Sequence, residues 1–363
     1  LRLAAYQVLL LDRVPAYAAV NDAVEATRLG RGKDAAGFVN AVLRKLRPEH
    51  LDAELPDAPM IRLAVTTALP TWLAKRWARQ LGPEQAHDLG VALLERAPLT
   101  ARLNPLRGDR EAALAGLEAE GATVEPGRWA PDAVSLSDLV DPFSSGSYLE
   151  GRWTVQDEAA QLATLLLAPE PGMTVLDACA GVGGKATHLA AVMEDRGQVI
   201  CLDRSERKLE LLLEHCRRLG VSCCQARHTD LLAPSALEGI QAQRVLVDAP
   251  CSGLGVLRRH PELKWRDPPD IQALARLQRE LLERAASALA PGGELVYAVC
   301  TTTMEEGPDQ LAWAREALPF LRPAPPPPRG PLASLAGPDG AVALWPHRHG
   351  CDGFYMARFI NQR

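Results

Sequence analysis

From Trp153 onward, short apolar runs alternate with segments of helical periodicity, and this alternation is the feature that most restricts how the chain can fold. Strands that alternate with helices at this spacing predict an α/β fold built on a doubly wound, mostly parallel sheet. The predicted strands are 174–177, 198–203, 223–227, 244–248 and 294–299, and the predicted helices are 157–167, 185–194, 206–219, 270–289 and 305–317. The proline run 323–331 predicts an exposed loop, because proline cannot donate to a sheet ladder, and 351–360 predicts a late strand.

The first 150 residues follow another pattern. Helical periodicity over 2–12, 17–28 and 34–46 predicts part of a small all-helical bundle. The leucine at position 1 already lies inside this pattern, which suggests a domain whose N-terminal half is missing. Further along, a helix from Pro70, a helix at 83–96, a strand at 99–104 and a helix at 109–120 are predicted. The expected domains are a partial helical domain at 1–55, a helical and small α/β connector at 56–150 and an α/β domain at 151–363.

The formal net charge of −5 gives no support for a strongly basic nucleic-acid binder. Contact with a polyanion must therefore come from local patches. The densest patch is Arg258, Arg259, His260, Lys264 and Arg266, for which a solvated charged loop is an equally weighted alternative.

The eight cysteines are irregularly spaced, no signal-like segment is present, and no apolar run is long enough to span a bilayer. This combination predicts a cytoplasmic protein with free thiols and no membrane partner.

Reactive side chains follow two of the predicted strands. Asp248 and Cys251 come just after 244–248, and Cys300 comes directly after 294–299. Because the carboxyl ends of parallel strands share one edge of a sheet, and open α/β sheets place their chemistry there, we expect these three side chains to converge.

A glycine-rich segment, Asp177-Ala-Cys-Ala-Gly-Val-Gly-Gly-Lys185, follows the first strand of this sheet and begins a helix. Glycines in such a turn let backbone amides approach a ligand, and Asp203, at the end of the next strand, suits ribose hydroxyls. The segment matches neither a Walker loop nor a dinucleotide fingerprint. An acidic strand end favours S-adenosylmethionine instead, because its cationic sulfonium can lie near Asp177, and Asp230 could then read the adenine edge.

The remaining cysteines predict little chemistry. Buried cysteines are usually inert, and we expect this of Cys179, Cys201, Cys216, Cys223 and Cys224. No pair has the short spacing of a zinc site, and the segment His347-x-His349-x-Cys351 is more typical of a surface loop than of a ligand set. We therefore expect no metal.

Four motifs carry a specific resemblance. They are Asp248-Ala-Pro-Cys-Ser-Gly, Arg259-His-Pro-Glu-Leu-Lys-Trp, Leu295-Val-Tyr-Ala-Val-Cys-Thr followed by Glu305-Glu306, and Asp352-Gly-Phe-Tyr. Together they resemble the RNA 5-methylcytosine methyltransferases of the NOL/NOP/Sun type, whose catalytic domain is a Rossmann-like methyltransferase sheet. In addition, Tyr6-Gln-Val-Leu-Leu-Leu-Asp-Arg-Val-Pro, Asn21-Asp-Ala-Val-Glu and Phe38-Val-Asn-Ala-Val-Leu-Arg resemble the second half of a NusB-type RNA-binding domain.

The resemblance implies a role for each reactive residue. Cys300 would attack carbon 6 of cytosine, Asp248 would hydrogen-bond ring nitrogen 3, Lys185 would help hold the base or its phosphate, and Cys251 would assist release. S-adenosylmethionine would contact Cys179, Ala180, Gly181, Val182, Gly183, Gly184, Lys185, Asp203, Asp230 and Asp248. The chain departs from the family at Gly181-Val182, where Ala-Pro is usual, and at Val299, where threonine is usual; neither change removes a reacting group.

The implied substrate is a cytosine of 16S ribosomal RNA, methylated by a monomeric enzyme before assembly of the ribosomal subunit is complete. One alternative is the same chemistry on transfer RNA or another ribosomal site. Another is an RNA-binding regulator of NusB type with a vestigial catalytic domain, against which the intact Asp248, Cys251 and Cys300 argue.

Overall fold

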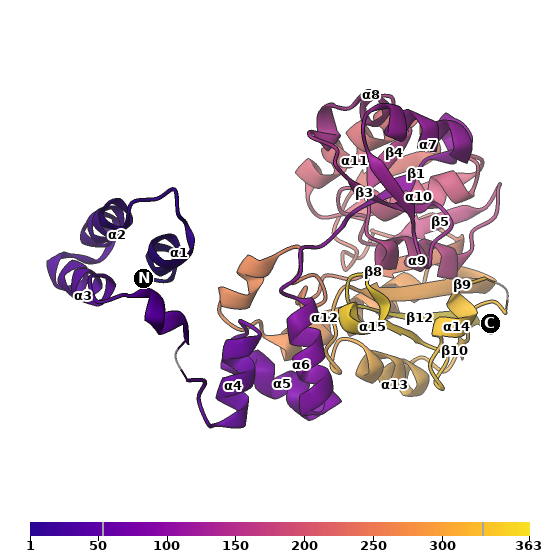
Figure 1. The fold of residues 1–363 in the computed structure, drawn as a ribbon. Helices are drawn as coiled ribbons and strands as arrows, with labels where there is room; N and C mark the ends of the chain where they lie inside the picture. The colour runs from indigo at the N-terminus through magenta and orange to yellow at the C-terminus, as the bar shows by residue number, and fades with distance from the viewer. Residues whose placement is uncertain (53, 329) are drawn as a thin grey trace. The chain divides into compact units, whose positions relative to one another are not determined.

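The computed structural model describes residues 1–52, 54–328 and 330–363, which form two compact units, Leu1–Val65 and Thr66–Arg363 (Figure 1). The smaller unit contains the helices α1 (Arg2–Leu10), α2 (Ala16–Arg31) and α3 (Lys33–Leu43), the turn η1 (Pro48–Asp52) and most of α4 (Pro59–Thr66). The three helices predicted here are confirmed. Their core is small, with Ala4, Val39 and Leu43 at its centre.

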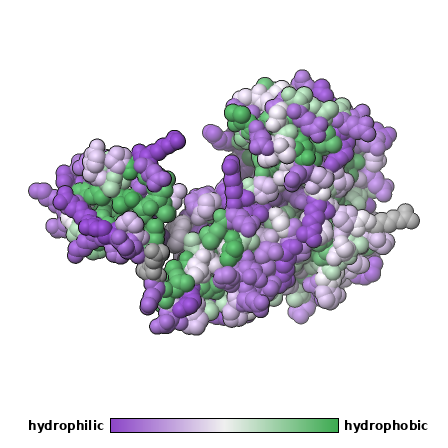
Figure 2. All heavy atoms as spheres, viewed as in Figure 1, coloured by the Kyte–Doolittle hydropathy of each residue, from purple (hydrophilic) through white to green (hydrophobic). Residues whose placement is uncertain are grey.

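Large apolar side chains also reach the surface of the smaller unit. Leu3, Tyr17, Leu29 and Phe38 are all exposed, and hydrophobic residues gather visibly on this unit in Figure 2. Among the helices of the described ranges, none has the length and apolar character needed to cross a bilayer.

The larger unit begins with a helix pair and a small sheet. The helices α5 (Thr71–Leu81) and α6 (Pro83–Ala92) precede an antiparallel sheet of order β2-β3-β1-β4. Its strands are β1 (Leu99–Leu103), β2 (Thr123–Pro126), β3 (Ala133–Ser137) and β4 (Trp153–Val155). This region also contains the helices α7 (Arg110–Ala119) and α8 (Gly146–Leu149) and the turns η2 (Pro105–Arg107) and η3 (Pro142–Ser144). The helix predicted at 83–96 ends earlier than expected, at Ala92.

The second sheet has the predicted doubly wound pattern. Its order is β10-β12-β9-β8-β5-β6-β7, with β11 paired to β12. Strands β5 to β9 are mutually parallel, and β10, β11 and β12 are antiparallel additions at one side. The bounds are β5 (Thr174–Asp177), β6 (Gln198–Asp203), β7 (Cys224–His228), β8 (Ala242–Asp248), β9 (Leu289–Val299), β10 (Leu321–Ala324), β11 (Val342–Leu344) and β12 (Phe354–Asn361).

Helices cover both faces of this sheet (Figure 1). The covering helices are α9 (Glu158–Leu167), α10 (Gly184–Val192), α11 (Glu206–Leu219), α12 (Ile271–Ala286) and α13 (Pro308–Ala317). Two short helices, α14 (Leu332–Leu335) and α15 (Pro346–His349), and the turn η4 (Pro261–Trp265) lie in the connections. Val175 packs into one core and the adjacent Leu176 into the other. Because both faces are buried, the strands read as continuous apolar runs.

Two local predictions are wrong. Pro323 does not lie in a loop but pairs with Phe359 as part of β10, and this is possible because β10 is an edge strand, where a missing amide costs no ladder bond. The helix predicted from 305 begins at Pro308, since proline fits the first helical turn and residues 302–307 form a loop that returns to the sheet edge.

Candidate active site

The carboxyl ends of β5, β6, β8 and β9 form one edge of the large sheet. Asp177, Asp203 and Asp248 are the last residues of β5, β6 and β8, and Cys300 follows directly after β9. The parallel register places Asp248 opposite Ala298, two residues before Cys300. The structure therefore brings Asp248, Cys251 and Cys300 to the same edge, as the sequence predicts.

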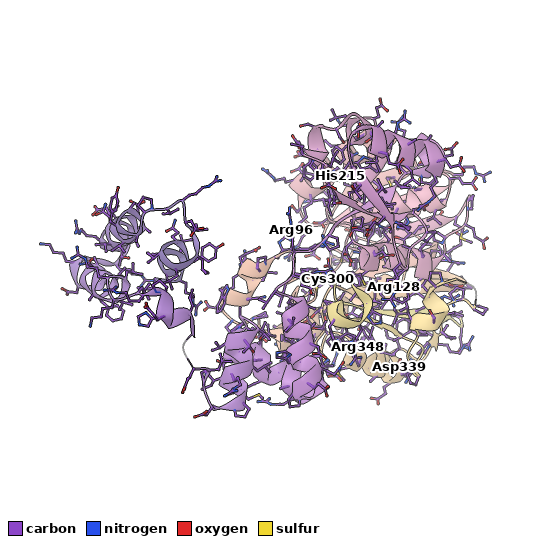
Figure 3. The ribbon with its side chains drawn as sticks, viewed as in Figure 1. Arg96, Arg128, His215, Cys300, Asp339 and Arg348 are labelled. Atoms are coloured by element: carbon purple, nitrogen blue, oxygen red, sulfur yellow. The ribbon has the colours of Figure 1, made fainter. Side chains whose placement is uncertain are left out.

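The two thiols are in direct contact. The Sγ atoms of Cys251 and Cys300 are 3.2 Å apart, and both side chains are half-buried (Cys300 is labelled in Figure 3). The hydrogen bond from Cys251 lowers the pKa of Cys300, and the same hydrogen bond raises the pKa of Cys251 well above its usual value. These opposite directions mean that, when the pair loses a proton, the thiolate forms on Cys300 and the remaining proton stays on Cys251.

A cation lies beside the thiols. Lys185 reaches from the first turn of α10 to Asp248, with Nζ 2.7 Å from Oδ2. Burial lowers the pKa of Lys185, but Asp248 more than offsets that effect, so the pKa is raised and the side chain stays charged. Lys185 also contributes to the lowered pKa of Cys300.

The glycine-rich segment turns sharply between β5 and α10. Gly181 and Gly183 both have positive φ, +56° and +86°, and the Gly181 amide donates to Asp203 Oδ2 at 3.0 Å. A Cβ at Gly183 would lie 2.6 Å from Leu212 Cγ, so only glycine fits there. Val182, one of the family departures, is partly exposed, and its carbonyl contacts His215 Nδ1 at 2.9 Å (His215 is labelled in Figure 3).

A pocket opens next to this turn. Its walls include three of the predicted cofactor residues, Cys179, Asp203 and Asp230, together with apolar side chains of Leu231, Leu232, Leu277 and Leu281. Residues 180–185 and Asp248 do not line this pocket, and among them Lys185 and Asp248 bond to each other beside the thiols. Acidic groups at one end of an apolar slot suit a nucleoside, whose ribose needs acceptors and whose base needs apolar surface.

Asp177 is a buried carboxyl group at the same sheet edge. It is almost fully buried, and neither carboxylate oxygen has a hydrogen-bond partner among the described residues. Burial, with a further contribution from Asp248, raises its pKa to about 7. A buried carboxylate without a donor is costly unless a proton or a cation compensates it, so this position fits the cationic sulfonium of S-adenosylmethionine.

The basic patch is not a free surface. Arg259 bonds Asp157 and Asp352 at 2.6 and 2.8 Å, and Lys264 is buried with Nζ 3.3 Å from the Leu93 carbonyl. Both cations bond groups within the protein. The prediction that they contact a polyanion is therefore corrected for Arg259 and Lys264. Of the patch, His260 and Arg266 remain exposed.

The His347–Cys351 segment is also internal in part. His349 Nδ1 accepts from the Trp345 amide at 2.8 Å, and Cys351 is buried. Within the described ranges, no group of three His, Cys, Asp or Glu side chains is arranged to hold a metal ion.

Comparison with solved structures identifies the fold. A solved structure described as a methyltransferase homolog protein from Pyrococcus horikoshii is 26% identical, with a TM-score of 0.73 over 84% of this chain and 100% of that one. The fold is therefore that of the α/β methyltransferases.

Comparison with protein-family models and curated relatives identifies the family within this class. Residues 164–360 match the family model of the 16S rRNA methyltransferase RsmB/F, residues 69–141 match its ferredoxin-like domain and residues 1–48 match the NusB family. A ribosomal RNA small subunit methyltransferase B from Vibrio cholerae is 37% identical over 96% of this chain and 78% of its own length. One of the same name from Pseudomonas syringae is 36% identical over 97% and 78%. The chain belongs to the RsmB/F family of 16S rRNA methyltransferases.

Proposed function

We propose that this protein transfers a methyl group from S-adenosylmethionine to carbon 5 of a cytosine in 16S ribosomal RNA. The observation that carries the proposal is the contact of two strand-end thiols beside the Lys185–Asp248 ion pair. Carbon 5 of cytosine is a poor nucleophile until a thiolate adds at carbon 6, so the reaction needs a thiolate and a proton source together. The names of the relatives support the ribosomal target.

Cys300 is the proposed nucleophile. Of the two thiols, it is the one whose pKa is lowered, because Cys251 donates a hydrogen bond to it and Lys185 lies nearby. When its Sγ bonds to carbon 6, the electron pair of the 5,6 double bond moves toward ring nitrogen 3, which then takes a proton. The Lys185–Asp248 pair holds a proton at this edge of the sheet and would deliver it there.

Cys251 is the proposed release residue. Its pKa is raised chiefly because it shares a proton with Cys300. Once Cys300 is bound to carbon, that charge is gone, and Cys251 loses its proton more easily. Its thiolate can then take the proton from carbon 5, so that the carbon–sulfur bond to Cys300 breaks, the Cys300 thiolate leaves and the 5,6 double bond is restored. Ring nitrogen 3 would return its proton to the Lys185–Asp248 pair.

S-adenosylmethionine, when bound, supplies the electrophilic methyl group. Asp203 would accept hydrogen bonds from its ribose, Asp230 would face its adenine, and Asp177 would lie near its sulfonium. The backbone from Cys179 to Lys185, with Asp248, would complete the contacts. These assignments rest on the pocket walls and on the buried Asp177 carboxyl, whose oxygens have no hydrogen-bond partner among the described residues.

Two single variants test the thiol assignment. Cys300→Ala should abolish both methyl transfer and any covalent protein–RNA species, because no adduct forms. Cys251→Ala should still attack and methylate, and then remain bound to RNA as a slow-migrating band on a denaturing gel. Cys216→Ala, a buried cysteine of α11 remote from the sheet edge, is the matched control and should behave as wild type.

The reverse result would identify Cys251 as the nucleophile and overturn our assignment. Mapping of 5-methylcytosine in ribosomal and transfer RNA, with and without the protein, tests the substrate. Methylation confined to transfer RNA would support the alternative target, and no methylation of either would support an RNA-binding regulator.

A further inference from the structure

A buried carboxylate lies behind the two thiols and has no part in the reaction steps above. Glu306 is 0% exposed and accepts five hydrogen bonds. Its Oε1 accepts from the Ser252 amide at 2.8 Å and from Gln278 Nε2 at 3.1 Å. Its Oε2 accepts from the hydroxyls of Ser252, Thr301 and Thr303 at 2.6, 3.1 and 2.8 Å.

These donors come from both thiol loops. Ser252 is the residue after Cys251, and Thr301 is the residue after Cys300. Their hydroxyls are also 2.8 Å from each other. One carboxylate therefore joins the two backbone segments at the positions adjacent to the two sulfur atoms.

Two buried side chains, Gln278 and Tyr297, hold Glu306 in place. Gln278, from α12, donates to both Glu306 and the Pro250 carbonyl, and the Tyr297 hydroxyl donates to the Glu306 carbonyl at 2.7 Å. Both side chains are almost fully buried. We call Glu306 and its partners Ser252, Thr301, Thr303, Gln278 and Tyr297 the Glu306 network.

A carboxylate suits the position of Glu306 because of the hydrogen bonds it can accept. Ionised, it only accepts hydrogen bonds, and all of its contacts can donate. Burying a charge is expensive, and a well-packed apolar group commonly gives equal or better stability. Stability alone is therefore a weak reason for a charge at this place, whereas five convergent bonds define the separation of the two loops.

We propose that Glu306 is a positioning residue that holds the Cys251 and Cys300 loops at the sulfur–sulfur contact needed for thiolate formation and release. The role as stated rests on the proposed function. The charge of Glu306 also contributes to the raised pKa of Cys251, which keeps the shared proton on that thiol.

The test compares Glu306→Ala with Glu306→Gln and with Glu294→Ala. Glu294 is a matched control because it lies on β9, the strand before Cys300, six residues away from that thiol. Its side chain is 15% exposed and pairs with Arg358 at 2.7 Å. Each protein is alkylated with iodoacetamide over a pH series, without RNA, and modification of Cys300 is followed by mass spectrometry. Methyl transfer and thermal unfolding are measured in parallel.

The charged and titrating groups around Cys300 are Cys251, Lys185 and Asp248. If Glu306 is replaced by alanine, the loops separate, the bond from Cys251 weakens, and the alkylation midpoint of Cys300 should move to higher pH. Methyl transfer should fall about 100-fold, the scale of a misplacement of about 1 Å. Glu306→Gln keeps the shape of the side chain, so its methyl-transfer rate should fall less. Glu294→Ala should lower the unfolding temperature but leave the alkylation midpoint of Cys300 unchanged.

A wild-type midpoint and rate in folded Glu306→Ala would overturn the proposal, as would an equal shift in Glu294→Ala. If Glu306→Ala does not fold, Ser252→Ala removes the hydroxyl contacts with Glu306 and Thr301 and should move the alkylation midpoint of Cys300 in the same direction. An unchanged midpoint in Ser252→Ala would equally overturn the proposal. The two proposals can fail separately. If the alkylation midpoint moves in Glu306→Ala but the wild-type protein forms no covalent species with RNA, the proposed function is contradicted. The role of Glu306 in positioning the two thiols would still hold.

Discussion

At the scale of single residues, the pH dependence of the reaction follows from the shared proton of the thiols. The attacking Cys300 must be ionised, and the bond from Cys251 lowers its pKa from the ordinary value. Single-turnover methylation should therefore rise with pH up to this lowered pKa and then level off. In Cys251→Ala the bond is lost, so the rising limb of the first methyl transfer should move to higher pH. An unmoved limb in rapid-quench measurements would show that Cys251 does not lower the Cys300 pKa.

Asp177 gives a second residue-scale prediction. Its pKa in the folded protein is about 7, raised from 3.8 first by burial and then by Asp248. The folded state therefore favours the neutral acid, and this carboxyl destabilises the fold progressively as pH rises from about 4 to about 7. Asp177→Asn should therefore raise the free energy of unfolding by up to about 4 kcal/mol near pH 7 and by little near pH 4. Urea unfolding of both proteins across this range measures the difference, and parallel curves would contradict the shift.

The sequence could predict the reactive residues but not what holds them. Asp248 and Cys300 are identifiable because strand ends of a parallel sheet share an edge. Glu306 was visible only as part of a family motif, because its role depends on Ser252 and Gln278, whose positions are set by loop closure and by α12. No local sequence pattern predicts these contacts.

At the scale of elements, the turn into α10 depends on one glycine. Gly183 has φ of +86° and no room for a Cβ against Leu212, whereas Gly184 has ordinary φ and nothing within 4 Å of its Cβ position. Gly183→Ala should lower the free energy of unfolding by about 2–4 kcal/mol from backbone strain and overpacking. Gly184→Ala is the control and should be neutral or slightly stabilising in chemical denaturation. Equal effects of the two would mean that neither constraint operates.

Helix α5 supports the loop after Cys300. Gln80 Nε2 donates to the Thr302 carbonyl at 2.8 Å, and Trp77 Nε1 contacts the Thr302 hydroxyl at 3.3 Å. Gln80→Ala should therefore raise amide exchange over 301–307 because a loop carbonyl loses its partner. Gln85→Ala, on α6, contacts His347 and Arg348 instead and should leave that exchange unchanged. Hydrogen exchange followed by mass spectrometry distinguishes the two, and unchanged protection in Gln80→Ala would remove α5 from this role.

The order of strands and helices was predictable because apolar runs and helical periodicity are local. The exceptions, β10 and the start of α13, were decided by nonlocal structure. Pro323 pairs because it falls on an edge, and residues 302–307 stay out of the helix because Thr303 and Glu306 turn back to the thiol loops.

At the scale of the molecule, charges that look like a ligand surface in the sequence join distant parts of the larger unit. Arg259 lies in the loop after β8, yet it contacts the Pro98 carbonyl before β1, Asp157 before α9, and Asp352 before β12. Periodicity cannot separate such a half-buried, ion-paired cation from a solvated one, because both occur in polar loops.

This arrangement makes Arg259 a stability residue for the larger unit. Its guanidinium serves Asp157 and Asp352 at once, and a side chain without charge would leave two carboxylates facing each other, 8% and 4% exposed. Arg259→Ala should therefore lower the free energy of unfolding by about 3–5 kcal/mol, the cost of breaking a buried pair. Arg259→Lys should recover only part of this, since one ammonium cannot match a forked donor. Arg266→Ala removes a neighbouring exposed charge and should change stability by less than about 0.5 kcal/mol. Urea unfolding followed by tryptophan fluorescence measures all three, and a stable Arg259→Ala protein with weakened RNA binding would restore the basic patch as a polyanion surface.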